Sequence, residues 1–110
     1  MYKLILEIPV RDPSQIARVF DIVKRHAEDM EAAVFITGNG VAWARGEVLC
    51  VTYALLRPSV GIQPTGPGVK IVVQLTSENP EKLVEEAGRL ERSLKGGGFT
   101  CVVSGGGDST

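Results

Sequence analysis

The sequence predicts an α+β domain built from two β-α-β halves, with an antiparallel sheet and both helices on one face. A strand–helix–strand pattern occurs twice, and the two copies align without a gap when the chain is shifted by 67 residues. With 110 residues, 44% of them hydrophobic, the chain suits a single domain over residues 1–110 with one core. We expect the halves at residues 3–40 and 70–107, and a hairpin and loop inserted at 41–68.

The first half begins with an apolar, β-prone run at residues 3–8. Asp12 then suits the N-cap of a helix, Pro13 suits the first helical position, and Gln15 completes a capping box. Apolar residues recurring every three to four positions predict an amphipathic helix over about 13–29: Ile16, Phe20, Val23, Ala27 and Met30. A strand follows at 33–37 and ends at a glycine turn.

The segment between the halves contains two kinds of structure. Residues 41–44 and 48–56 are strand-like and flank a tight turn at Arg45-Gly46-Glu47, which predicts a β-hairpin. Residues 57–68 contain three prolines and three glycines, which predicts an irregular loop.

The second half repeats the first. Residues 70–75 form a strand, and Asn79-Pro80 repeats the cap followed by proline. An apolar stripe predicts a helix over about 80–95: Leu83, Ala87, Leu90 and Leu94. Glycines 96–98 end the helix, residues 99–104 form the last strand, and glycines 105–107 close that strand.

The shift of 67 also brings identical residues together: Lys3 with Lys70, Pro13 with Pro80, Arg25 with Arg92, Gly38 with Gly105, and Gly40 with Gly107. Caps, helix faces and strand ends agree as well. Two such halves make the ferredoxin-like sandwich, here with an inserted β-hairpin.

Strand alternation separates the two faces of the sheet. Val34, Ile36, Cys101 and Val103 should face the helices, whereas Ile5, Phe35, Val72 and Val102 should lie in the middle of the opposite, open face. Such an apolar patch rarely stays in water. We expect the hairpin, with Trp43 and Tyr53, to extend or cover the sheet and to help build a homodimer. A monomer with the hairpin folded back is the alternative.

Composition limits the other partners. A net charge of −1 gives no bulk-charge argument for nucleic acid or membrane. No run of about 18 apolar residues exists, so we expect no membrane span and a cytoplasmic protein. The two cysteines, Cys50 and Cys101, suit small buried hydrophobes, with a disulfide as the alternative. With one histidine and no C-x-x-C, we expect neither a metal nor another cofactor.

Two glycine-rich turns are candidate anion or ligand sites, because glycine backbone can bind an anion. They consist of Gly38, Asn39 and Gly40, and of Ser104, Gly105, Gly106 and Gly107. The ordinary alternative is that each turn only ends a strand.

Two short segments resemble known families. Residues 104–110, SGGGDST, resemble the S-G-G-x-D-S signature of PP-loop ATP pyrophosphatases, which implies a loop that holds a pyrophosphate. The first strand followed by Arg11-Asp12-Pro13-Ser14-Gln15 resembles the opening of ACT-type regulatory domains. That resemblance implies the ferredoxin-like fold and ligand binding at subunit interfaces.

Two further interpretations remain beside a non-enzymatic binding or assembly module. A basic side of the first helix, with the hairpin aromatics, is typical of an RNA-associated subunit: Arg11, Arg18, Lys24 and Arg25. An enzyme with a small pocket between sheet and hairpin would use Cys50, Tyr53 or His26. No catalytic residues can be assembled into a specific arrangement, so the binding or assembly module is the first interpretation.

Overall fold

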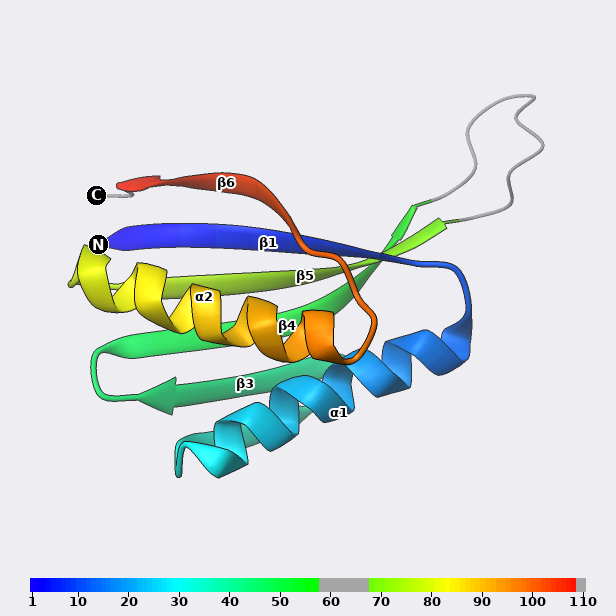
Figure 1. Cartoon of the computed structure of the whole chain (residues 1–110), viewed down its shortest axis with the longest axis horizontal. Helices are drawn as coiled ribbons and strands as arrows, with labels where there is room; N and C mark the ends of the chain where they lie inside the picture. Colours follow the sequence, from blue (N-terminus) through cyan, green and yellow to red (C-terminus); the bar gives the residue numbers. More distant parts are fainter. Residues whose placement is uncertain (58–67, 109–110) are drawn as a thin grey trace.

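The computed structural model describes residues 1–57 and 68–108 and has one six-stranded antiparallel sheet with two helices (Figure 1). The elements follow the chain as β1 (Tyr2–Val10), α1 (Pro13–Asp29), β2 (Ala33–Thr37), β3 (Gly40–Arg45), β4 (Val48–Arg57), β5 (Gly68–Ser77), α2 (Pro80–Gly96) and β6 (Val102–Asp108). The α+β class is therefore confirmed. Most of the loop expected at 57–68 lies outside the described residues, as do the last two residues of the SGGGDST segment.

The strands lie in the order β2-β3-β4-β5-β1-β6. The β3–β4 hairpin turns at Gly46, whose φ of 57° is the left-handed conformation that glycine adopts easily. This hairpin lies within the sheet, between β2 and β5, and therefore extends the sheet without covering its open face.

Both helices begin where their local sequence predicts. The Asp12 carboxylate accepts a hydrogen bond from the Ser14 backbone N–H at 3.0 Å, and Gln15 completes the capping box. The Asn79 side chain accepts from the backbone N–H groups of Glu81 and Lys82. Each cap satisfies backbone donors that have no partner within the helix.

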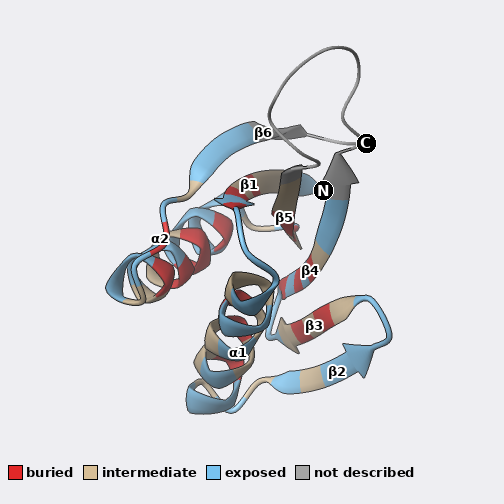
Figure 2. Ribbon diagram, turned by 90° about the vertical axis from the view of Figure 1, so that its right-hand side faces the viewer, coloured by how far each residue is buried: buried red, intermediate tan, exposed pale blue. Residues whose placement is uncertain are grey.

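One core lies between the sheet and the two helices, which pack on the same face (Figure 2). Its fully buried side chains come from the central strands and from both helices: Leu6, Ile8, Ile71, Val73, Leu75, Cys50, Val19, Val23, Leu90 and Leu94. Trp43 is also fully buried there, against His26 of α1. Trp43 was expected at the homodimer interface of the hairpin, but its place in β3 directs it toward the helices, so its side chain is not available on the surface of this chain.

The two outermost strands are less covered than expected. Ile36 of β2 and Val103 of β6 occupy helix-side positions in the sheet, yet they are 68% and 60% exposed. Two helices about 10 Å wide cover roughly 20 Å, whereas six strands about 4.8 Å apart span roughly 24 Å between the outermost axes. With the β3–β4 hairpin between β2 and β5, the sheet is thus wider than its helical layer.

The glycines of the last strand also differ from expectation. Gly105, Gly106 and Gly107 pair with Ile5, Leu4 and Lys3 of β1, so they continue β6 and do not form a turn that closes it. The register shifts between Ile5 and Leu6, which marks a bulge or irregularity in this pairing.

Candidate functional site

The positions of β3 and β4 in the sheet determine the path of α1. This helix connects β1 to β2, which are separated in the sheet by β5, β4 and β3. Four strand spacings are about 19 Å, whereas a helix of 17 residues is about 25 Å long, so α1 must cross the sheet obliquely. Figure 1 shows this crossing, with α2 lying closer to the strand direction.

A groove of about 890 Å³ lies between the first half of α1 and the β2–β3 turn. Most of its lining is apolar: Ile16, Ala17, Phe20, Ile36, Val41, Tyr53, Ala54 and Val69. Asp21 and Lys24 contribute the charged groups of the lining. Both are engaged on α1 itself, Asp21 with Arg25 at 3.1 Å and Lys24 with Glu28 at 3.8 Å. The charged groups of the groove therefore already have partners on α1.

The first predicted glycine turn forms one wall of this groove. Gly38, Asn39 and Gly40 all line it, and the Thr37 hydroxyl donates to the Gly40 carbonyl at 3.2 Å. Gly40 is required by packing, because a Cβ there would lie 1.9 Å from the Thr52 carbonyl oxygen. The second predicted turn, Ser104 to Gly107, lies in β6 and does not line the groove.

The open face has its apolar groups in different places from those expected. Val72 is only 5% exposed, with Tyr53 and Glu7 as its cross-strand partners, and Ile5 is half-buried. Glu7 also makes an ion pair with Lys70 at 2.5 Å on this face. The centre is therefore largely covered by the longer side chains of neighbouring strands.

The exposed apolar groups of that face lie on both edge strands and on β4, one of the two middle strands. Phe35 on β2 is 58% exposed, Val102 on β6 is also exposed, and Tyr53 is half-buried. β4 adds the exposed side chains of Leu49, Val51 and Leu55. The sequence of β4 is apolar on both faces of the strand. Because helices cover only one face of the sheet, one of these two sets of apolar side chains is left exposed.

β2 forms one free edge of the sheet and is exposed on both sides. Phe35 lies on its open-face side and Ile36 on its helix side, and its five residues include neither a charge nor a proline. Unpaired backbone groups on such an edge can bind another strand. Alternation along the strand places Phe35 on the open face and Ile36 toward the core, and it does not reveal that Ile36 is exposed at this edge.

The basic residues proposed for RNA binding have contacts within the chain. Arg18 donates to the Gly97 carbonyl at 2.9 Å and lies 5.1 Å from the centre of the Phe99 ring. Lys24 and Arg25 pair with acidic residues on α1, and Arg11 is exposed. Of the hairpin aromatics, Trp43 is in the core, whereas Tyr53 lines the same groove as Lys24.

The residues considered for catalysis do not converge. Cys50 is buried on the helix side of β4, whereas Tyr53 has the opposite parity on that strand. Burial raises the pKa of the Cys50 thiol to about 12 and that of Cys101 to about 11. Thiols with such pKa values are poor nucleophiles near neutral pH. Both cysteines are free, so they do not form a disulfide with each other in this structure.

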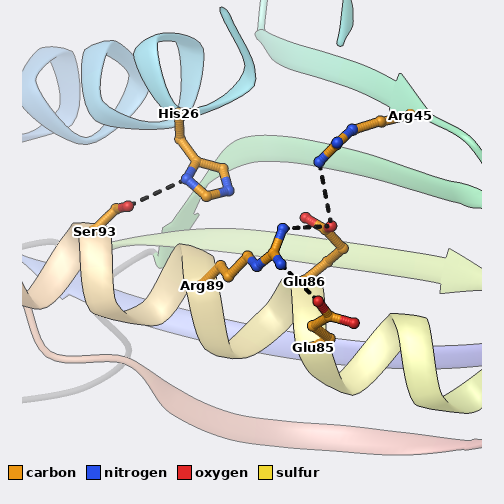
Figure 3. Close-up of polar contacts among 6 residues, drawn as sticks. All are labelled: His26, Arg45, Glu85, Glu86, Arg89 and Ser93. Atoms are coloured by element: carbon orange, nitrogen blue, oxygen red, sulfur yellow. Dashed lines mark hydrogen bonds and ion pairs between the residues drawn. The ribbon is translucent and has the colours of Figure 1, made fainter. Parts of the chain in front are cut away.

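His26 lies between the helices, where its Nδ1 is 3.2 Å from the Ser93 hydroxyl (Figure 3). Glu86 approaches from α2 and makes ion pairs with Arg45 at 3.9 Å and Arg89 at 3.6 Å. Burial lowers the pKa of His26, and the nearby carboxylates of Glu86 and Asp29 oppose that shift.

Comparison with known proteins gave no match among family models, curated proteins or solved structures. Within residues 1–57 and 68–108, no helix is long and apolar enough to cross a membrane. Across the same ranges, no three His, Cys, Asp or Glu side chains are grouped so that they could hold a metal ion.

Proposed function

We propose that this chain is a small assembly module that forms a homodimer through the β2 edge, so that two sheets join into one. The observation that carries the proposal is the exposed strand β2, which is uncharged and apolar on both sides. Natural proteins usually protect such an edge with charge, proline or a covering element. A partner strand would satisfy the free backbone groups and cover both apolar sides at once.

The other edge is a poorer site for pairing. β6 contains three successive glycines, has a shifted register against β1, and ends at Asp108. Glycine weakens strand pairing because it offers no side chain to pack and loses more backbone entropy. This contrast favours β2 as the strand that pairs with another chain.

A second copy of β2 can supply both the backbone hydrogen-bonding groups and the apolar side chains that this edge lacks. In an antiparallel pairing centred on Phe35, that residue lies opposite its own copy, and Val34 lies opposite Ile36. The strand has no charged residue that would repel its copy. Pairing five residues per subunit gives an interface at the small end of the range, so we expect a dissociation constant in the micromolar range.

We propose the ferredoxin-like arrangement for the fold, widened by the β3–β4 hairpin. The support is the pairing of β1 with both β5 and β6, and the two helices of 17 residues that begin 67 residues apart. Glu31 and Gly98, also 67 residues apart, both have positive φ just after a helix. His26 and Ser93, with the same separation, contact each other across the helix pair.

The dimer is tested by sedimentation velocity over a range of micromolar concentrations. Ile36→Lys places a charge on the β2 edge, and Val84→Lys is the matched control because Val84 is 64% exposed on α2. We expect the wild type and Val84→Lys to dimerise with rising concentration, and Ile36→Lys to remain monomeric.

A wild type that stays monomeric at high micromolar concentration would overturn the proposal. A dimer that tolerates Ile36→Lys but is lost in Val102→Lys would instead assign the interface to the β6 side of the open face. Circular dichroism of each variant establishes that the lysine has not unfolded the chain.

A further inference from the structure

The groove beside α1 adjoins the free edge of the sheet. Its walls are the first half of α1 and the β2–β3 turn, and Ile36, whose side chain is exposed on the edge strand, is one of its lining residues. A chain that pairs with β2 along this edge therefore comes to lie next to the groove.

The register of the β2 dimer determines which part of the second copy arrives there, so this inference rests on the proposed function. In the antiparallel pairing centred on Phe35, the partner's Ala33 lies opposite Thr37. Just before its Ala33, each chain passes from α1 into β2 at the sheet edge (Figure 2). Continued beyond the paired strands, the register places this corner of the partner, residues 28–32, beside the groove wall formed by residues 38–40.

The corner between α1 and β2 is acidic. Glu28, Asp29 and Glu31 are all exposed there, and the first two lie in the last turn of α1, where the helix dipole disfavours negative charge. The end of α2 differs, because Lys95 lies in its last turn and Gly98 has the positive φ that Glu31 has after α1. A cation from a second subunit would therefore stabilise the end of α1.

Lys24 is the cation that the groove offers. It lines the groove, and its Nζ lies 3.8 Å from Glu28 of the same helix. That distance is too long for a hydrogen bond, so the pair leaves the N–H donors of Lys24 able to bind a second carboxylate. The acidic residue of the lining, Asp21, is held by Arg25 at 3.1 Å. The groove thus presents a positive group to the partner's acidic corner.

We propose that, in the β2 dimer, the groove of each subunit receives the α1–β2 corner of the other, with Lys24 bound to the partner's Glu31. Glu31 is the residue that the register places beside Asn39 of the groove wall. Its carboxylate would lie at the glycine turn that the sequence predicts as a candidate anion site. Two-fold symmetry forms this contact twice, which enlarges an interface otherwise limited to five residues of each strand.

The test uses charge reversal and sedimentation velocity at low ionic strength. Lys24→Glu alone and Glu31→Lys alone each bring like charges together at both contacts, so we expect each dimer to be about tenfold weaker than that of the wild type. When the two variants are mixed, their heterodimer has unlike charges at both contacts and should form as readily as the wild-type dimer. The double variant, whose net charge is unchanged, should also dimerise like the wild type.

Lys82→Glu and Glu85→Lys are the matched controls, because they reverse the same charges at exposed positions of α2. Each should dimerise like the wild type, and mixing them should add nothing.

The outcomes separate this contact from the β2 dimer itself. If the wild type dimerises and Ile36→Lys does not, but the reversals at residues 24 and 31 have no effect, the groove contact is overturned and the β2 dimer stands. The contact is equally overturned if neither the mixture nor the double variant recovers wild-type affinity. A monomeric wild type overturns both.

Discussion

At the residue scale, the side chains that depart most from the sequence-based expectations are Trp43, Val72 and His26. Alternation along a strand predicts which side a residue takes, but it does not predict what covers that side. Val72 lies on the open face and is still buried beside Tyr53 and Glu7, whereas Trp43 is covered by α1. His26 is in a polar site between the helices, which a pattern of apolar spacing cannot reveal.

The lowered pKa of His26 predicts how stability depends on pH. Because burial lowers its pKa in the folded state below the ordinary 6.5, the unfolded chain takes up the proton first as the pH falls. The contribution of His26 to the free energy of unfolding should decrease from about pH 7.5 downward, and should level off below the folded-state pKa.

Urea unfolding followed by Trp43 fluorescence at pH 7.5 and pH 5 measures this dependence, with His26→Gln as the reference. The wild type should lose stability relative to His26→Gln over that interval. A relative gain would show that proton uptake stabilises the folded chain, contrary to the burial of the ring.

At the element scale, the helices follow from local sequence, whereas the strand order does not. The Asp12 and Asn79 caps act within one turn of the chain, so the sequence is sufficient to place Pro13 and Pro80 at the helix starts. The position of β2 beyond β3 and β4 depends on where the β3–β4 hairpin pairs, which is a long-range choice. The glycines of β6 suggest a turn locally, but pairing with β1 keeps them extended.

In the β2–β3 hairpin, we expect alanine substitutions at two glycines that are two residues apart to change the stability of the protein by different amounts. A Cβ at Gly40 would overlap the Thr52 carbonyl oxygen, whereas a Cβ at Gly38 would meet no atom within 4 Å. Gly40→Ala should lower the free energy of unfolding by about 2 kcal/mol or more, since the β3–β4 pairing must shift. Gly38→Ala should change it by less than about 0.5 kcal/mol.

Chemical denaturation of the two variants beside the wild type gives both values. Equal stabilities for Gly40→Ala and Gly38→Ala would contradict the close approach of β3 to β4. The comparison isolates that contact because both changes add one methyl group to the same hairpin.

At the scale of the whole molecule, the position of β3 and β4 in the sheet accounts for three features. Placing β3 and β4 between β2 and β5 makes the sheet wider than its two helices, sends α1 obliquely across it, and leaves β2 as an exposed edge. The sequence predicted the hairpin and an apolar surface in need of a partner. It did not predict that β2 would be exposed on both sides, because β2 extends beyond the helices only when β3 and β4 lie between β2 and β5.

Amide hydrogen exchange of β2, measured residue by residue at low and at high protein concentration, tests the β2 dimer most directly. Backbone pairing with a second copy should slow the exchange of those β2 amides that are not bonded to β3, and only at high concentration. Amides of β6 should exchange alike at both concentrations. Fast exchange of the outward β2 amides at every concentration would contradict a dimer joined through this strand.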